Sequence, residues 1–581
     1  MFFEQFSYSS DRLIYRLAAL GLAALFYLGP ARAEPIMEGQ RSHPVAAENG
    51  MVATSHYEAS RVALDVLKSG GNAIDAAVTA GFVLAVTQPR SGNIGGGGFM
   101  LVSSEKSGEV VAIDYREKAP KGAFETMFQD QQGNVVKARS RFSHLSAGVP
   151  GTVAGLAMAL EKYGTLSLPE ALAPAIKLAE EGFEVPRRFS DGLKTGQERL
   201  RRWPSSEAVF YKPDGGFYEP GELFLQPDLA RTLRRISDQG VKGFYQGETA
   251  RLIVDDMEQH GGLITLEDLR SYRPVIRQPV KGNYRGYDIY SMSPPSSGGA
   301  HIVQILNMLE AYPIGRYGHN SASTIHLMAE AMKRAYADRS RYLGDSDFVD
   351  VPLAGITSKS YAGELRRGID PFISTSSEAL GPGDPLPYES GETTHFSIVD
   401  NMGNAVSNTY TINFSYGSGI VVPGAGFILN NEMDDFSAKP GVPNAYGLLG
   451  GKANAIEPEK RMLSSMSPTI VKRDGRNFLV TGSPGGSRII TTTLQVIMNV
   501  IDHGMNIQSA VNAPRIHHQW LPEEIRIEEG VSPDTVDLLR SKGHKVVQKK
   551  AMGAIQSIMI RDGTFYGAAD PRRSTSSAMG F

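Results

Sequence analysis

The usual sequence motifs of catalytic sites are scarce in this chain. Cysteine is absent, which excludes a thiol nucleophile, disulfides, thiolate zinc sites and iron–sulfur clusters. The 12 histidines include no H-E-x-x-H motif, and no Lys-Ser or Lys-Thr follows the glycine-rich run 92–98, so neither a zinc peptidase nor a phosphate-binding loop is indicated. One cluster remains, residues 392–397, which contains Thr393 and lies where the polar, Pro/Gly-rich stretch 381–391 gives way to a predicted strand.

The sequence around this threonine is more informative than the threonine itself. Strand propensity alone explains an interior threonine. Several strings rich in Asp, Asn, Arg, Ser and Gly, however, lie before and after it in the chain. They are residues 114–117, 411–413, 430–436, 461–468 and 481–488.

Together these strings resemble the γ-glutamyltranspeptidase family of N-terminal-nucleophile hydrolases. The resemblance runs from Gly95 to Pro571, and the strings occur in the family's order. It is specific because several strings are uncommon, namely Thr-Thr-His-Phe-Ser, Asn-Asn-Glu-Met-Asp-Asp-Phe and Ser-Pro-Gly-Gly-Ser-Arg-Ile. Members of the family are made as precursors that cut themselves before the nucleophilic threonine. The matching bond here joins Glu392 and Thr393.

The chemistry that the resemblance implies is two-step acyl transfer. Cleavage frees the α-amino group of Thr393, whose ordinary pKa of about 7.7–8.0 suits a general base for the hydroxyl of the same residue. That hydroxyl attacks the γ-amide of glutathione or another γ-glutamyl compound, and the resulting ester passes to water or to an amino-acid or peptide acceptor. Backbone N–H groups of Gly485 and Gly486 are the implied oxyanion donors, and Thr411 the implied support of the nucleophile. No metal or organic cofactor is implied.

The resemblance also implies a binding site for the glutamyl group. Arg116 matches the family's carboxylate-binding arginine, which can form a bidentate pair. The implied partners of the α-carboxylate are Arg116, Ser464 and Ser465, and those of the α-ammonium are Asn413, Glu432 and Asp435. Some relatives carry glutamine in place of Glu432. Tyr446, in the Pro/Gly-rich segment 437–451, matches an aromatic residue that covers the pocket.

Three other functions stay open at this stage. An acylase of the same superfamily, acting on glutaryl-type cephalosporin side chains, needs no acid facing an α-ammonium, so Asp435 disfavours it. A non-catalytic periplasmic protein that binds amino acids or peptides would explain export, but not the sequence around Thr393. An enzyme that hydrolyses without transfer cannot be told apart by sequence.

The elements that must position these residues predict a mixed α+β chain. Helical periodicity dominates residues 150–380, and strands are predicted on either side. Asp-Gly pairs at 474–475 and 562–563 stand between alternating apolar runs, which is a strong hairpin signal. Asn72 is expected to cap a buried helix over residues 73–86. The family implies a four-layer αββα sandwich in which a large chain, 34–392, and a small chain, 393–581, are intertwined as a heterodimer.

The first residues have the features of an export signal. Arg12 and Arg16 precede the apolar run 17–28, and the string Ala31-Arg32-Ala33 resembles a cleavage site. The run is shorter than the roughly 20 residues that span a bilayer as a helix. We expect residues 1–33 to be removed and the mature protein to be periplasmic or secreted, without a membrane anchor. A net charge of −3 gives no basis for binding nucleic acid.

Overall fold

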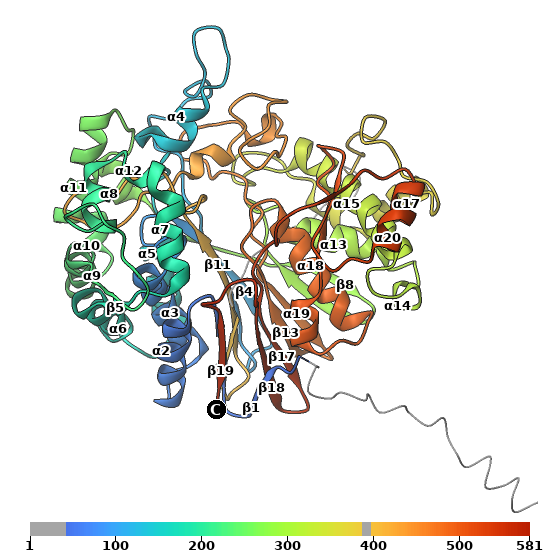
Figure 1. Cartoon of the computed structure of the whole chain (residues 1–581), viewed down its shortest axis with the longest axis horizontal. Coiled ribbons are helices and arrows are strands. Elements are labelled where there is room, and N and C mark those ends of the chain that lie inside the picture. The colour runs from blue at the N-terminus through green and yellow to red at the C-terminus, as the bar shows by residue number, and fades with distance from the viewer. Residues whose placement is uncertain (1–41, 386–396) are drawn as a thin grey trace, which may run out of the picture. The chain divides into compact units, whose positions relative to one another are not determined.

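The computed structural model describes residues 42–385 and 397–581. Its centre is a pair of antiparallel, seven-stranded sheets (Figure 1). Sheet I has the order β1 (Val45–Ala47), β18 (Thr564–Ala569), β17 (Gln556–Arg561), β13 (Arg476–Thr481), β12 (Thr469–Arg473), β9 (Tyr287–Ser291) and β8 (Val280–Tyr284). Sheet II has the order β19 (Ser577–Gly580), β2 (Met51–Thr54), β10 (Ser397–Val399), β11 (Ala405–Thr411), β3 (Gly97–Ser103), β4 (Val110–Tyr115) and β7 (Val275–Arg277).

Apolar side chains from both sheets meet between them. Leu101 and Val399 of sheet II belong to one buried cluster with Ile470 and Ile558 of sheet I. Alternate residues of each strand point to the opposite face of the sheet, where they pack against helices. The central strands are therefore buried on both faces, and every residue of β3 and β4 is buried.

Helices cover the outer face of each sheet (Figure 1). A second apolar cluster joins sheet II to α2 (Tyr57–Lys68), α3 (Ala73–Thr87), α5 (Thr152–Tyr163), α6 (Leu168–Glu181) and α9 (Pro227–Gln239). A third joins sheet I to α13 (Gly298–Leu309), α15 (Ala322–Tyr342), α18 (Arg488–Ile501) and α19 (Ile507–Asn512). The layers follow the order helix, sheet, sheet, helix, and the predicted αββα fold class is confirmed.

The other elements connect these layers or lie around them. The helices are α4 (Lys137–Phe142), α7 (Arg187–Leu200), α8 (Pro204–Phe210), α10 (Lys242–Tyr245), α11 (Gly247–His260), α12 (Leu266–Ser271), α14 (Ile314–Tyr317), α16 (Leu353–Thr357), α17 (Lys359–Arg367) and α20 (Pro533–Ser541). The strands are β5 (Phe183–Glu184), β6 (Leu223–Phe224), β14 (Ile516–His517), β15 (Ile525–Ile527) and β16 (Val546–Gln548). Within the described part of the chain, none of the helices has both the length and the apolar character needed to cross a bilayer.

Local sequence predicted several elements correctly. Asn72 caps α3 through a capping box with Asp75, and every residue of this helix is buried, as expected. Both Asp-Gly hairpins are also confirmed, as β12–β13 and β17–β18. The φ angles of these turn residues are positive, a conformation that Asp and Gly tolerate: Asp474 +52°, Gly475 +79°, Asp562 +53° and Gly563 +81°.

The hairpin β8–β9 lies within residues 150–380, where helical periodicity dominates the sequence and no hairpin was predicted. Its turn residues Arg285 and Gly286 have φ angles of +50° and +85°, the same left-handed geometry as the Asp-Gly turns. Arginine does not favour this geometry, so the pair gave no hairpin signal. Pairing of β9 with β12, which is distant in sequence, completes the edge of sheet I.

Both sheets combine strands from the two predicted chains. In sheet II, β10 lies between β2 and β11, and β19 pairs with β2 on its other side. In sheet I, β12 pairs with β9. A cut after Glu392 would therefore leave one intertwined unit. The cut itself and the removal of residues 1–33 fall outside the described residues and stay predictions.

Candidate active site

A cavity of about 290 Å³ lies beside the ends of β2 and β11. Every predicted site residue that the structure describes lines it: Arg116, Thr411, Asn413, Glu432, Asp435, Tyr446, Ser464, Ser465, Gly485 and Gly486. Glu392 and Thr393 lie outside the described residues. Ser397, the first described residue after them, begins β10 and pairs with Ala53, which lines the cavity.

The guanidinium group of Arg116 is completely buried, directly after β4. Its Nη1 donates to Glu432 at 2.7 Å and lies 3.4 Å from a carboxylate oxygen of Glu117. Its Nη2 donates to Asp435 at 2.8 Å, and its Nε donates to the carbonyl of Met462 at 3.3 Å. A guanidinium has five N–H groups, so one N–H on Nη2 is left for a ligand. The donors expected to form a bidentate pair with a substrate carboxylate are mostly taken by acids of the chain.

The acids around Arg116 outnumber it. We call Arg116, Glu117, Glu432 and Asp435 the site cluster, which holds three carboxylates and one guanidinium. One carboxylate oxygen of Glu117 and one of Glu432 are buried without a hydrogen-bond partner among the described residues. Burial raises the pKa of Glu117 to about 7, and it raises the pKa of Glu432 and of Asp435, although Arg116 acts in the opposite direction on each. Such a site is suited to receive a cation.

The two serines are held by backbone contacts and by a second buried arginine. The N–H of Ser464 donates to the carbonyl of Pro295 at 2.7 Å, and its hydroxyl accepts from the N–H of Met466 at 3.1 Å. The hydroxyl of Ser465 accepts from Nη2 of Arg339 at 3.3 Å. Arg339 lines the cavity from α15 but was not predicted, because one arginine within a helix gives no signal in the sequence.

Asn413 presents an acceptor to the cavity. Its φ angle is +71°, and its backbone N–H donates to the hydroxyl oxygen of Thr411 at 2.7 Å. Its side-chain NH₂ donates to the carbonyl of Asn431 at 2.9 Å. This leaves Oδ1 of Asn413 without a hydrogen-bond donor among the described residues, so the oxygen can accept from a ligand.

Gly485 and Gly486 form a turn between β13 and α18, called the glycine turn here. Their φ angles of +145° and +60° disfavour any other residue. Neither backbone N–H donates a hydrogen bond within the described part of the chain, which leaves both for a ligand. A Cβ atom on Gly486 would lie 2.5 Å from the ring of Tyr446, whose hydroxyl donates to the carbonyl of Asn413 at 3.1 Å. Tyr446 therefore spans from the glycine turn to Asn413.

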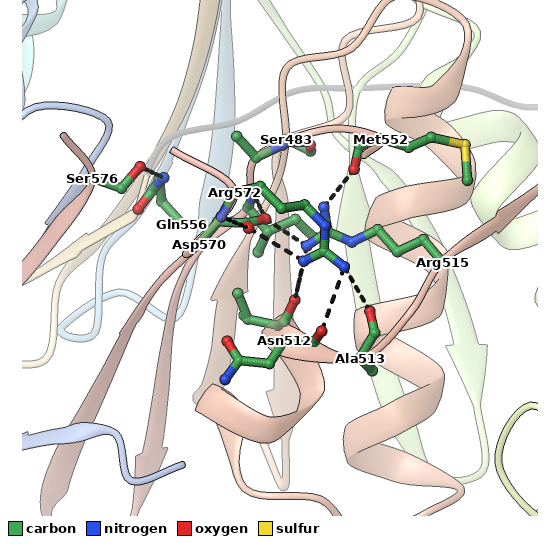
Figure 2. Close-up of polar contacts among 12 residues, drawn as sticks. Ser483, Asn512, Ala513, Arg515, Met552, Gln556, Asp570, Arg572 and Ser576 are labelled. Atoms are coloured by element: carbon green, nitrogen blue, oxygen red, sulfur yellow. Dashed lines mark hydrogen bonds and ion pairs between the residues drawn. The ribbon is translucent and has the colours of Figure 1, made fainter. Parts of the chain in front are cut away.

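A second cluster of buried charges, near Ser483, was not predicted (Figure 2). We call Arg515, Glu528, Asp570 and Arg572 the closed cluster. Nη2 of Arg515 pairs with Asp570 at 2.5 Å, and Arg572 pairs with Asp570 at 3.2 Å and also with Glu528. Two positive and two negative groups are thus balanced.

The closed cluster holds a backbone segment that reaches both sides of the active site. Asp570 accepts from the N–H of Ile555 at 2.7 Å. The neighbouring Ala554 N–H donates to the hydroxyl of Ser483, just before the glycine turn, at 3.0 Å. The carbonyl of Gln556 accepts from the hydroxyl of Ser397 on β10 at 3.2 Å. One segment therefore supports the glycine turn and the strand that follows Thr393.

Another part of the cavity lining is basic. Arg90 and Arg573 line the cavity, and Arg188 of α7 lies close enough to affect Arg573. Burial and these two neighbours lower the pKa of Arg573 to about 9. No carboxylate of the described residues forms an ion pair with these three arginines. The cavity therefore has an acidic and a basic part.

Among residues 42–385 and 397–581, two groups of side chains have the composition of a metal site. They are His144, Asp256 and His260, and His326, Glu330 and His544. None of these residues lines the cavity. Glu330 pairs with Lys333 and Arg334 at 2.8 Å each, so its oxygens already have cationic partners.

The fold and this site define the class of N-terminal-nucleophile hydrolases. The crystal structure of cephalosporin acylase from Bacillus halodurans has the same fold, with a TM-score of 0.82 at 28% identity, covering 96% of this chain and 99% of that chain. The sequence matches the gamma-glutamyltranspeptidase family over residues 59–580. The chain belongs to the gamma-glutamyltranspeptidase family.

Individual relatives support the same assignment. The glutathione hydrolase proenzyme of Escherichia coli (strain K12) is 54% identical over 541 residues, which cover 93% of each chain. The acylase ACY 1 proenzyme of Pseudomonas sp. (strain SE83) is 39% identical over 535 residues, covering 90% of this chain and 92% of the relative. The family, fold class and enzymatic function predicted from the sequence are thus confirmed, and the acylase is the less supported alternative.

Proposed function

We propose that this chain is the precursor of a two-chain enzyme that hydrolyses glutathione and related γ-glutamyl compounds and transfers their γ-glutamyl group. One observation carries the proposal. The same cavity contains an excess of buried acid around Arg116 and two glycine N–H groups that no described acceptor uses. The first feature fits an amino-acid ammonium group, and the second fits an oxyanion.

Maturation is proposed to cut the bond between Glu392 and Thr393. The hydroxyl of Thr393 adds to the carbonyl carbon of Glu392, and the C–N bond breaks to leave an ester and a free α-amino group. Water then hydrolyses the ester to a carboxylate on Glu392 and a free hydroxyl on Thr393. The new amine has a pKa in the range suited to a general base.

In turnover the hydroxyl of Thr393 gives its proton to this amine and attacks the γ-carbonyl carbon of the donor. The N–H groups of Gly485 and Gly486 stabilise the oxyanion. The departing amine takes up a proton as the amide bond breaks, leaving a γ-glutamyl ester on Thr393. Water or the amine of an amino-acid or peptide acceptor then attacks the ester. Thr411, at the end of β11, is proposed to support the nucleophile.

The cavity walls suggest how a γ-glutamyl donor is recognised. The α-ammonium is proposed to bind Glu432, Asp435 and Oδ1 of Asn413. The α-carboxylate is proposed to bind the free N–H of Arg116 and the hydroxyls of Ser464 and Ser465. A glutaryl side chain has no ammonium to balance the excess acid, and this favours an amino-acid donor over an acylase substrate. Arg90 and Arg573, in the basic part of the lining, could bind the C-terminal carboxylate of glutathione, at the other end of the molecule from the glutamyl group.

Two further proposals concern access and location. Tyr446 lies against Gly486, so we expect the segment 437–451 to move when substrate enters and to cover the glutamyl group afterwards. Residues 1–33 are proposed to direct export to the periplasm or the medium.

Intact-mass spectrometry with N-terminal sequencing tests the proposal. We expect a fragment of about 20 kDa, the share of the 62.9 kDa chain that residues 393–581 make up, beginning Thr-Thr-His-Phe-Ser. Purified protein should release glutamate from glutathione, and Thr393→Ala should stay uncut and inactive. An uncut wild-type chain, or a Thr393→Ala variant that is cut and active, would refute the assignment of Thr393.

A further inference from the structure

The chain just before the predicted cleavage segment is held by both backbone groups of Gly383. Its N–H donates to Oδ1 of Asp338 at 2.8 Å, and its carbonyl accepts from the hydroxyl of Tyr342 at 2.6 Å. Asp338 and Tyr342 are one turn apart on α15, so they project from the same face of the helix. The contact therefore fixes the direction of the chain as well as its position.

Asp338 is itself fixed by two neighbouring helices. Its Oδ2 accepts from Nε2 of Gln304 on α13 at 2.6 Å and from the hydroxyl of Tyr361 on α17 at 2.9 Å. The side chain is fully buried, and this burial raises the pKa of Asp338 to about 6 against the opposing effect of its hydrogen-bond donors. Three helices thus determine where the carboxylate meets Gly383.

Close backbone packing adds to these hydrogen bonds. A Cβ atom on Gly383 would lie 2.1 Å from the hydroxyl oxygen of Tyr361. A Cβ atom on Gly355 of α16 would lie 1.6 Å from the carbonyl oxygen of Pro385. No room exists for a side chain at either glycine. The segment 383–385 is therefore seated against α15, α16 and α17 at both of its ends.

We propose that Asp338, Tyr342 and Tyr361 form a clamp on residues 383–385 that positions the following chain for self-cleavage. This inference rests on the proposed cut between Glu392 and Thr393. Pro385 and Ser397 are the last and first residues that the structure places on either side of that bond. Glu392 is seven residues beyond Pro385, and Thr393 is four residues before Ser397. Extended chain of these lengths reaches at most about 25 Å and about 14 Å, so the two fixed ends together limit where the bond can lie.

The clamp should affect maturation and not turnover. Self-cleavage is intramolecular, so its rate depends on how often the scissile bond reaches a reactive geometry. A γ-glutamyl donor instead diffuses into the cavity, which none of the clamp residues lines. Asp338, Tyr342 and Tyr361 are therefore positioning residues for the cut alone.

The test compares the rate of cutting with the activity of the cut enzyme. Tyr342→Phe removes one hydrogen bond to Gly383 and should slow appearance of the 20 kDa fragment about 2- to 10-fold, since one such bond contributes about 0.5–1.5 kcal/mol. Asp338→Ala should slow it further, and Asp338→Asn, which keeps an oxygen for the Gly383 N–H, should recover part of the rate. Tyr211→Phe is the matched control, because its hydroxyl also donates to a backbone carbonyl, that of Leu193, at 3.0 Å.

Activity is then measured with a γ-glutamyl anilide and divided by the amount of cut protein. We expect kcat/KM per cut molecule to stay within about 2-fold of wild type in Tyr342→Phe, with a change in Tm no larger than that of Tyr211→Phe, which should cut at the wild-type rate. Wild-type cutting rates in both Tyr342→Phe and Asp338→Ala would overturn the clamp, while cutting of the wild type before Thr393 would still support the proposed function. An equal fall in cutting rate and in kcat/KM would also overturn the clamp, because the residues would then act on the site itself.

Discussion

The site cluster and the closed cluster bury the same kinds of side chain but differ in charge balance. The closed cluster pairs two arginines with two acids, and each group has a partner of opposite charge. The site cluster sets three acids against Arg116 and leaves two carboxylate oxygens without a partner among the described residues. Arg116, Glu432 and Asp435 of the site cluster line the cavity, whereas no member of the closed cluster does.

This difference separates a structural role from a binding role. Burying charge is unfavourable unless the charges are paired, and the closed cluster meets that condition within the chain. The site cluster meets it in part, through Arg116, through the nearby Arg339 and through the raised pKa values of its acids, and a bound cation would add to this pairing. Incomplete pairing of buried acids beside a cavity is therefore the observation that supports the proposed ammonium site.

The largest expected effect on stability comes from removing one acid of the closed cluster. Asp570→Ala leaves Arg515 and Arg572 without one of their acids and removes the acceptor for the N–H of Ile555. We expect a loss of about 3–5 kcal/mol in the free energy of unfolding, as for other broken buried pairs, with slower cutting because the glycine turn and β10 lose a common support. Thermal unfolding measures the effect. An unchanged Tm would show that the pairing of charges in this cluster contributes little to stability.

Removing one charge from the site cluster should instead affect binding. Asp435→Asn should raise KM for γ-glutamyl donors about 10- to 100-fold, because a hydrogen bond between charged groups contributes about 1.5–3 kcal/mol. The Tm should change little or rise, since the variant has less unbalanced buried charge. Steady-state kinetics and a melting curve of the same preparation check both parts. Unchanged kinetics would exclude a contact between Asp435 and the substrate ammonium.

Glu432→Gln should have a smaller effect on KM, less than about 5-fold. Burial raises the pKa of Glu432 well above its ordinary value, so the charged form is disfavoured and its replacement by a neutral amide should cost less. Glutamine keeps an oxygen for Nη1 of Arg116. A loss of affinity as large as that of Asp435→Asn would mean that Glu432 is ionised when substrate binds.

The last prediction concerns the pH dependence of stability. Glu117 has a pKa of about 7 in the folded chain against 4.5 as its ordinary value, so the folded state binds the proton more tightly. Its contribution to stability is therefore present below about pH 4.5 and is lost as pH rises to about 7. Glu117→Gln should raise Tm relative to wild type more at pH 8 than at pH 5. Parallel Tm curves for the two proteins would contradict the raised pKa.

Local signals in the sequence predicted part of the fold. The cap at Asn72 and the Asp-Gly turns depend only on neighbouring residues, and both are confirmed. Hairpin β8–β9 was missed because an Arg-Gly turn resembles ordinary loop sequence, and pairing with distant β12 completes its sheet edge. No local signal joins β19 to β2, although the two strands pair at opposite ends of the chain.

The residues of the site likewise divide into those that the sequence predicted and those that it missed. The family's strings predicted Arg116, Asp435 and the two glycines, and all of them line the cavity. Arg339, Arg515 and Asp570 were missed because each is a single charged residue whose partner is distant in sequence. Such residues usually lie on the surface, so only the folded chain shows that they are buried.

The interleaved strands of the two sheets have a consequence for refolding. Before a cut after Glu392, the strands on either side belong to one molecule, and each is always near its partners. After the cut they belong to two, so the halves of a denatured enzyme must meet by diffusion before β10 can return between β2 and β11. Recovery then becomes a second-order process that competes with aggregation. The stability of the mature enzyme would therefore be kinetic, set by how slowly it unfolds. Unfolding after the cut would be close to irreversible.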